Sequence, residues 1–221
     1  MTQKIAALFV ETDGAYFNLP GVEAFDIQRD AKTYDADWPA VAHPPCQRWG
    51  RFWHGSTRKP FQFKFGDDEG CFASALASIR RVGGVIEHPA YSGAWNAVDH
   101  PDKPGFGLPK PEAGKGWSAP DEFGGRSCYV EQCHWGHKAR KATWLYAVGI
   151  DFNSFPLTAG RTRAVVPDWM IERYGEKKAR KIGVVAMEGG KDKVKNRNAT
   201  PLPFRDLLID MALSVYARGL V

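Results

Sequence analysis

The chain has 221 residues, of which 43% are hydrophobic and 25% are charged, and its formal net charge at pH 7 is +5. This composition is typical of a folded globular protein and excludes the disordered and fibrous classes. No stretch approaches the roughly 18 consecutive apolar residues that a membrane span needs, and the apolar run at residues 5–10 is too short for a signal peptide. We therefore expect a cytoplasmic protein without a membrane partner, long enough for one α/β domain and a small additional lobe.

The positive charge is concentrated in one segment. Residues 171–197 contain nine lysines and arginines and four acidic residues, and nine minus four is five, which equals the net charge of the whole chain. A basic lobe on a neutral body predicts a polyanionic partner such as DNA. The alternative interpretation is a solvated helix face followed by a loop.

The four cysteines have no spacing typical of a disulfide framework. They are Cys46, Cys71, Cys128 and Cys133. In a reducing compartment they remain thiols, so a thiolate is available for chemistry.

Three short apolar runs near the start of the chain predict buried strands. They span residues 5–10, 22–27 and 40–43. Pro44 ends the third run, because proline has no N–H to donate to a neighbouring strand.

Residues 67–84 predict a helix, with acidic residues in its first turn, arginines near its end and two glycines where it stops. A fourth strand follows, of which residues 85–87 are the clearest part, and Pro89 ends it. Residues 91–126 are rich in Gly, Pro and Lys and have no periodic pattern, which is typical of a functional or mobile segment.

Two further strands are predicted at residues 128–135 and 142–149, joined by a loop. Residues 200–219 predict a helix, in which Thr200 is the cap and Pro201 the first helical residue. Its apolar face contains Leu207, Leu208, Met211, Ala212 and Val215.

This order of elements predicts one α/β domain built on a mostly parallel, Rossmann-like sheet, with a C-terminal hairpin and a closing helix. Residues 1–160 and 200–221 would form the main domain, and residues 161–199 the basic lobe. Ligands of open α/β sheets bind beyond the carboxyl ends of the strands. Because Cys46 and Glu87 both lie at such ends, we expect a site there.

Three motifs in order resemble those of the DNA (cytosine-5) methyltransferases of phage type. The first is "HPPC" at residues 43–46, and the second is "IEHP" at residues 86–89, with Cys46 and Glu87 lying 41 positions apart. The third is "EQCHWGHKARKATWLYAVG" at residues 131–149, which is similar to the family's glutamine-containing strand and hairpin. The last predicted helix is similar to the family's closing segment. The resemblance implies a methyltransferase fold and modification of cytosine in DNA.

The resemblance assigns roles to three catalytic candidates. Cys46 would add to C6 of the base as a thiolate, because C5 is a poor nucleophile until that addition. The two prolines before the cysteine would hold its loop stiff and position the sulfur. Glu87 would hydrogen-bond to the ring nitrogen N3 and the exocyclic amine. Arg48 would lower the pKa of the thiol and stabilise charge at the base carbonyl, and the base would leave the duplex to reach the pocket.

The methyl donor implied by the resemblance is S-adenosylmethionine. The family's cofactor loop, F-x-G-x-G, corresponds here to "FVETDGAYFNLPG", with a glycine only at Gly14 where two or three are expected near the strand end. We expect a reduced cofactor site, in which backbone must approach the ligand closely. Its predicted residues are Glu11, Asp13, Gly14, Asp26 and Pro44.

A third set of residues is expected to face DNA. The set comes from the hairpin and the basic lobe and comprises Gln132, His134, Lys138, Arg140, Lys141, Lys191, Lys193 and Lys195. The family's Glu-Asn is Glu87-His88 here, and its Gln-x-Arg is Gln132-x-His134. A small lobe that binds phosphate without reading many bases predicts low or short-site sequence specificity.

Four other interpretations stay open. A zinc site could use Cys128, Cys133, His134 and His137, but this spacing matches no strong zinc pattern, so no metal is predicted. The chain could instead be a non-catalytic DNA- or protein-binding module, or could modify a pyrimidine with another donor. Finally, Cys46 could be a small buried hydrophobic residue, since free cysteines are often buried.

Overall fold

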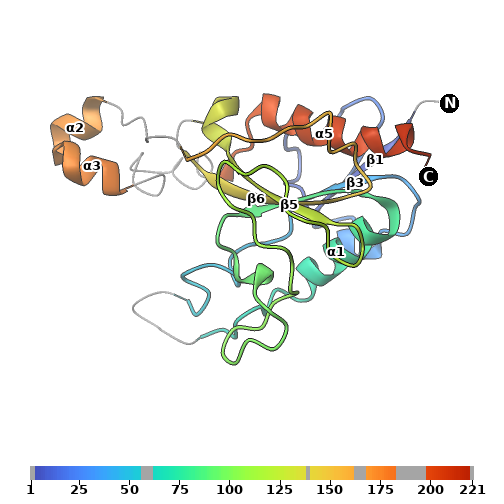
Figure 1. The fold of residues 1–221 in the computed structure, drawn as a ribbon, viewed down its shortest axis with the longest axis horizontal. Helices are drawn as coiled ribbons and strands as arrows, with labels where there is room; N and C mark the ends of the chain where they lie inside the picture. The colour runs from blue at the N-terminus through green and yellow to red at the C-terminus, as the bar shows by residue number, and fades with distance from the viewer. Residues whose placement is uncertain (1–2, 56–61, 138–139, 162–167, 183–197, 220–221) are drawn as a thin grey trace.

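The protein is described by a computed structural model that covers residues 3–55, 62–137, 140–161, 168–182 and 198–219. Its centre is a six-stranded sheet with the strand order β2-β1-β3-β4-β6-β5 (Figure 1). The strands are β1 (Ile5–Leu8), β2 (Val22–Phe25), β3 (Ala40–Ala42), β4 (Gly84–Pro89), β5 (Arg126–Glu131) and β6 (Ala142–Val148). The first four are parallel, and β6 runs antiparallel to both of its neighbours. The predicted α/β class with a mostly parallel sheet is confirmed.

The register brings the ends of the parallel strands to one edge of the sheet. Leu8 of β1 pairs with Phe25 of β2 and with Ala42 of β3, and Ala42 pairs with Ile86 of β4. Strand β4 continues past this line, so that Glu87 extends beyond the end of β3. The chain order also reverses between β1 and β3, which is where open α/β sheets bind ligands.

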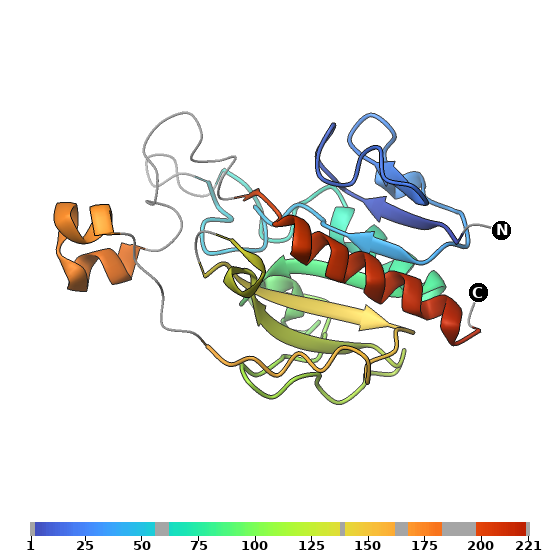
Figure 2. The same ribbon diagram turned by 90° about the horizontal axis from the view of Figure 1, so that it is seen from above.

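One long helix covers each face of the sheet (Figures 1 and 2). Helix α1 (Cys71–Val82) packs through residues such as Phe72 against Ile86, and α5 (Leu202–Ala217) packs through residues such as Leu208 against Val85. Adjacent residues of β4 therefore point to opposite faces, and both faces are apolar. This two-sided burial is what a parallel sheet requires.

Two helix starts differ from the sequence-based prediction. Helix α1 begins at Cys71, because Gly70 has a φ of 76° and the acidic residues before it lie outside the helix. Asp68 nevertheless stabilises this terminus, because its carboxylate accepts the Phe72 backbone N–H at 2.9 Å. Helix α5 begins at Leu202 with Pro201 as its N-cap, so the predicted cap by Thr200 is wrong.

The predicted strand at residues 128–135 is also shorter than expected. Strand β5 ends at Glu131, and residues Gln132–Trp135 form a 3-10 turn, η3. Two further 3-10 turns are η1 (Ala31–Thr33) and η2 (Gly93–Trp95). The turn η3 matters for the site, because it redirects Gln132 toward β4.

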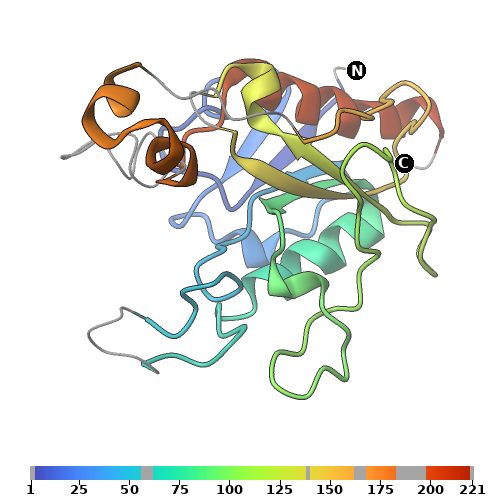
Figure 3. The same ribbon diagram turned by 60° about the vertical axis from the view of Figure 1, so that its left-hand side comes forward.

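The predicted basic lobe contains two short helices, α2 (Asp168–Tyr174) and α3 (Glu176–Ile182), which pack on each other. They lie apart from the sheet in all three ribbon views (Figures 1, 2 and 3). The predicted DNA-facing residues of this lobe, Lys191, Lys193 and Lys195, lie outside the described residues. Within the described ranges, no helix has the length and apolar character needed to cross a bilayer.

Asp68 links helix α1 to the loop that carries Cys46, and we predict that its replacement destabilises the fold. Its Oδ2 atom accepts both the Phe72 N–H and the indole N–H of buried Trp49, at 2.9 and 2.8 Å. Asp68→Ala leaves two buried donors unpaired and should lower the free energy of unfolding by about 2 kcal/mol in urea denaturation. The exposed neighbour Asp67 is the control, since Asp67→Ala should change it by no more than about 0.5 kcal/mol. Equal effects of the two substitutions would contradict this role.

Candidate active site

Glu87 is the centre of the candidate site at the carboxyl edge of the sheet. Its side chain is 11% exposed. The Oε2 atom accepts a hydrogen bond from Nδ1 of His43 at 3.1 Å, and Oε1 accepts one from Nε2 of Gln132 at 2.9 Å. The Thr143 hydroxyl lies 3.4 Å from Oε1. Groups from β6 and from the segments that follow β3 and β5 therefore converge on one carboxyl group of β4.

A hydrogen-bonded chain continues from Glu87 to the loop after β1. Nε2 of His43 lies 2.8 Å from the hydroxyl of Tyr16, whose side chain is buried. Burial raises the pKa of Tyr16 well above its usual value, so the phenol stays protonated. Nδ1 of His43 donates to Glu87, and Nε2 of the same ring is the atom that faces the Tyr16 hydroxyl. The Tyr16–His43–Glu87 chain thus joins three strand ends.

Glu87 is a carboxylate at neutral pH despite its burial. Burial raises its pKa, but the hydrogen bond from His43, together with the positive charges of His43 and Lys141, outweighs that effect and lowers the pKa to about 2. A buried carboxylate of this kind accepts hydrogen bonds and favours a positively charged or N–H-bearing partner. At neutral pH Glu87 is therefore a hydrogen-bond acceptor.

Lys141 is a cation whose charge interacts with those of Glu87 and Cys46. Burial lowers its pKa, while the charges of Glu87 and Cys46 oppose that shift. Its ammonium group donates to the backbone carbonyl groups of Asn198 and Ala199, at 3.2 and 2.8 Å. Its backbone has a φ of 39°, a strained conformation that is frequent at functional sites. The thiol and the carboxylate therefore lie within electrostatic range of one ammonium group.

The thiol of Cys46 is exposed, so the interpretation of Cys46 as a small buried hydrophobic residue is wrong. Two backbone hydrogen bonds of Trp49 anchor its loop. The Trp49 N–H donates to the Cys46 carbonyl at 3.1 Å, and the Trp49 carbonyl accepts the Gly93 N–H at 2.8 Å. Cys128 gives the contrast, because it is fully buried and its burial raises the pKa of the thiol to about 12. Exposure beside a cation is the setting of a reactive cysteine.

Two residues near the thiol have other surroundings than the sequence predicted. The guanidinium of Arg48 lies 3.4 Å from the centre of the Phe63 ring and donates to the Trp53 carbonyl, so these contacts place it against the following loop. His88 is buried between Phe72 and Trp95, and burial lowers its pKa to about 4 although the Pro45 carbonyl opposes this shift.

Gln132 was expected to face DNA, but its side chain is fully buried beside Glu87. Its amide nitrogen is engaged by Glu87 and by the Thr143 hydroxyl at 3.0 Å. Its Oε1 atom is buried and has no hydrogen-bond partner among the residues that the structure describes. A buried unpaired acceptor is costly unless a ligand supplies a donor. The site therefore offers acceptors, from Glu87 and Gln132, to a ligand that carries N–H groups.

The remaining residues expected at DNA are only partly placed by the structure. His134 is exposed and packs edge-on against Trp135. Arg140 is 44% exposed on its side chain and forms an ion pair with buried Glu131 at 3.4 Å. Lys138, like the three lysines of the lobe, lies outside the described residues.

The predicted cofactor residues surround the loop after β1. Glu11 and Asp13 are exposed, and Pro44 is buried. Gly14 donates its N–H to the Glu11 carbonyl at 2.9 Å, and a Cβ atom on Gly14 would lie 2.7 Å from that oxygen. This glycine is therefore required by a tight turn of the loop itself.

Asp26 and Tyr16 limit the room for adenosylmethionine at this edge. Asp26 accepts the Thr12 hydroxyl at 2.6 Å and the backbone N–H groups of Gln28 and Arg29 at 3.0 Å each, so both of its oxygens are engaged. Tyr16 lies across the point where the strand order reverses and packs on His43, with ring centres 5.2 Å apart. These residues do not form a glycine-lined cradle for the cofactor, so we derive no step through it.

One cluster has the composition of a metal site. Ligand atoms of Glu131, Cys133 and His134 lie within 4.8 Å of one another. This cluster differs from the zinc-ligand set suggested by the sequence, which included Cys128. Cys128 is buried on the α5 face and donates to the Leu157 carbonyl. Arg140 already pairs with the carboxylate of Glu131. A cation beside that carboxylate opposes the binding of a metal ion.

Comparisons with protein-family models, with curated proteins and with solved structures found no match to this chain.

The lowered pKa of Glu87 predicts a specific pH dependence of stability. Since the folded pKa, about 2, lies below the ordinary value of 4.5, the ionised carboxylate stabilises the fold above pH 4.5, and this contribution is lost as the pH falls through about 2. Glu87→Gln should therefore be less stable than the wild type at pH 6, by a difference that shrinks as the pH is lowered from 4.5 toward 2. Urea denaturation across this range measures it, and a difference that stays constant with pH would contradict the assignment.

Proposed function

We propose that this protein modifies cytosine in DNA by covalent addition of Cys46 to C6 of the base. The observation that carries the proposal is that the Glu87 carboxylate is hydrogen-bonded by His43, which lies three residues before the exposed thiol of Cys46. The six-stranded sheet and the closing helix α5 are compatible with a Rossmann-like fold of methyltransferase type. The sequence motifs at residues 43–46, 86–89 and 131–149 support the same family.

The residues supply a balanced addition step. The Cys46 thiolate forms a bond to C6 while the electron pair of the C5–C6 double bond moves to C5. The base takes a proton from water at N3, and Glu87 and Oε1 of Gln132 accept hydrogen bonds from this N3–H and from the exocyclic amine, which makes the ring more electrophilic. C5 then takes a proton from water. In the reverse direction C5 loses either proton and the thiolate leaves, so the hydrogen at C5 exchanges with solvent.

Modification beyond this exchange needs a donor that reacts with C5 in place of the proton. The resemblance implies transfer of a methyl group from S-adenosylmethionine, and the predicted residues at the edge between β1 and β3 fit that cofactor poorly. The donor is therefore tested separately, by calorimetric titration of the protein with adenosylmethionine. Binding that is lost in Asp26→Ala would support the family's donor, and no binding would favour another donor.

DNA is the proposed macromolecular partner. The described part of the basic lobe contains Arg173, Lys177 and Lys178, which are exposed on α2 and α3. A separate basic lobe contributes mainly phosphate contacts, which hold DNA without reading its sequence. A thiol nucleophile also requires a reducing compartment such as the cytoplasm.

The second candidate function is a DNA-binding module without catalysis. It is favoured by the occupied oxygens of Asp26 and by the position of Tyr16 at the cofactor edge. Such a module would bind DNA but leave the hydrogen at C5 untouched. Exchange at C5 therefore separates the two functions without any donor.

We predict that the wild-type protein releases tritium from DNA that contains [5-³H]cytosine, in the absence of added donor. Cys46→Ala should abolish the release, because Cys46 is the proposed nucleophile. Cys71→Ala is the matched control, since Cys71 is a partly buried thiol at the start of α1, and it should release tritium at the wild-type rate. Release that survives in Cys46→Ala would exclude Cys46 as the nucleophile, and no release by the wild type would favour the binding module.

We also predict that Lys141 controls the pH dependence of this reaction. A cation near the thiol favours the thiolate, so Lys141→Gln should shift the pH profile of tritium release to higher pH. The exposed Lys115 is the control, and Lys115→Gln should leave the profile in place. If the Lys141→Gln profile coincides with that of the wild type, Lys141 does not act on the thiol.

A further inference from the structure

An aromatic hollow of about 480 Å³ lies near the carboxyl end of β4. We call it the Tyr91 hollow. Its lining includes the rings of Tyr91, Tyr129 and Trp144, together with the charged side chains of Glu112 and Arg161. The volume lies within the range of small-molecule sites, roughly 300–1,000 Å³.

The ring of Tyr91 presents flat apolar surface to solvent at the Tyr91 hollow. Tyr91 is 60% exposed, and its ring centre lies 5.3 Å from that of Trp144, at an angle of 57°. The backbone of Tyr91 has a φ of 66°, which is uncommon for a residue other than glycine. An exposed ring held against a buried one forms a platform on which a planar group can stack.

The polar groups of the hollow are suited to a nucleotide. Trp144 is 5% exposed, and its indole N–H has no acceptor among the described residues. The indoles of Trp49, Trp95 and Trp117, by contrast, donate to Asp68, Ser127 and the Phe155 carbonyl. The unpaired N–H calls for an acceptor on the ligand. Arg161, which donates to the Tyr91 hydroxyl, adds a positive charge for a phosphate.

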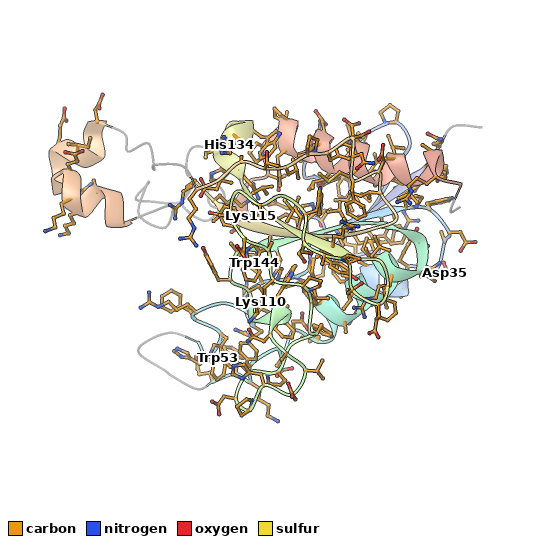
Figure 4. The ribbon with its side chains drawn as sticks, viewed as in Figure 1. Asp35, Trp53, Lys110, Lys115, His134 and Trp144 are labelled. Carbon is orange, nitrogen blue, oxygen red and sulfur yellow. The ribbon has the colours of Figure 1, made fainter. Side chains whose placement is uncertain are left out.

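The hollow lies at the same end of the sheet as the site, on the opposite face of β6. Tyr91 lies four residues after Glu87. Trp144 follows Thr143, whose hydroxyl contacts Glu87, and these two neighbours point to opposite faces of β6. Gly93, two residues after Tyr91, is bonded to the loop of Cys46 through the Trp49 carbonyl. In Figure 4, Trp144 lies between His134, just after β5, and Trp53, in the loop that carries Cys46.

We propose that the Tyr91 hollow binds the base of a nucleotide that flanks the target cytosine on the same DNA strand. The base stacks on Tyr91 and accepts the indole N–H of Trp144, and Arg161 binds the adjoining phosphate. This inference rests on the proposed function, because it takes the target base to be the one beside Cys46 and Glu87. A flanking base held in this way stabilises the target base outside the duplex.

A thermodynamic cycle with abasic DNA tests the proposal. The probes are single-stranded six-nucleotide oligomers with one cytosine, in which the flanking nucleotide on the 5′ or the 3′ side is either normal or abasic. For the wild type, one abasic substitution should weaken binding roughly 5- to 100-fold. In Tyr91→Ala the same abasic substitution should have no effect, since the ring that stacks on the base is gone. Phe123→Ala is the control: Phe123 is an exposed ring beneath Arg80, 46% exposed, and its loss should leave the wild-type response.

The indole N–H of Trp144 supplies a second measurement that does not depend on catalysis. In protein labelled with ¹⁵N at the indole nitrogens, the oligomer should shift the resonance that Trp144→Phe removes, while the resonances of the three paired indoles stay in place. If the abasic substitution weakens binding equally in Tyr91→Ala and in the wild type, the proposal is wrong. It is also wrong if the Trp144 resonance does not move at saturation.

These outcomes are separable from the fate of the proposed function. Cys46→Ala should retain both the abasic penalty and the Trp144 shift, because the hollow does not need the thiol. Tritium release without an abasic penalty would overturn the hollow alone. An abasic penalty without tritium release would leave the hollow as a DNA-binding site of a non-catalytic module.

Discussion

The site depends on keeping one buried carboxylate ionised at the edge of the sheet. Desolvation penalises the charge of Glu87, and the fold compensates with donors from the ends of neighbouring strands, His43, Gln132 and Thr143. Each donor is fixed by its own element, so the strand ends cannot separate without leaving the charge unpaired. Helices α1 and α5 bury the two faces of the sheet and hold those strand ends in register.

The same arrangement separates an exposed thiol from a buried one. Cys46 and Cys128 are both free thiols, but Cys128 lies among the apolar residues of the α5 face, where burial disfavours its thiolate. Cys46 is exposed on a loop that buried Trp49 anchors, and the charge of Lys141 reaches it. A thiolate is favoured near a positive charge and in contact with solvent. The ionised Glu87 then favours a base that brings its own N–H groups.

The sequence predicted the strands and their common edge, because apolar runs that end in proline are a local signal. It also placed Cys46 and Glu87 at neighbouring strand ends, as the register shows. It missed His43 and Tyr16, whose contact depends on how a loop folds over the sheet. The sequence assigned Gln132 and Lys141 to DNA. Their inward direction depends on the turn η3 and on the strained backbone of Lys141, and no residue pattern predicts either feature. The one local clue was the histidine directly before the two prolines, at the end of β3.

The central claim is that the thiol of Cys46 and the carboxylate of Glu87 act on the same pyrimidine. Peptide mass spectrometry of the protein after incubation with DNA containing 5-azacytosine tests it most directly, since the ring nitrogen at position 5 makes C6 more open to attack by a thiolate. If the two groups act together, the modified base is attached to the peptide that contains Cys46, and the yield falls sharply in Glu87→Gln. Attachment to a different cysteine, or a yield at Cys46 that does not depend on Glu87, would contradict the account.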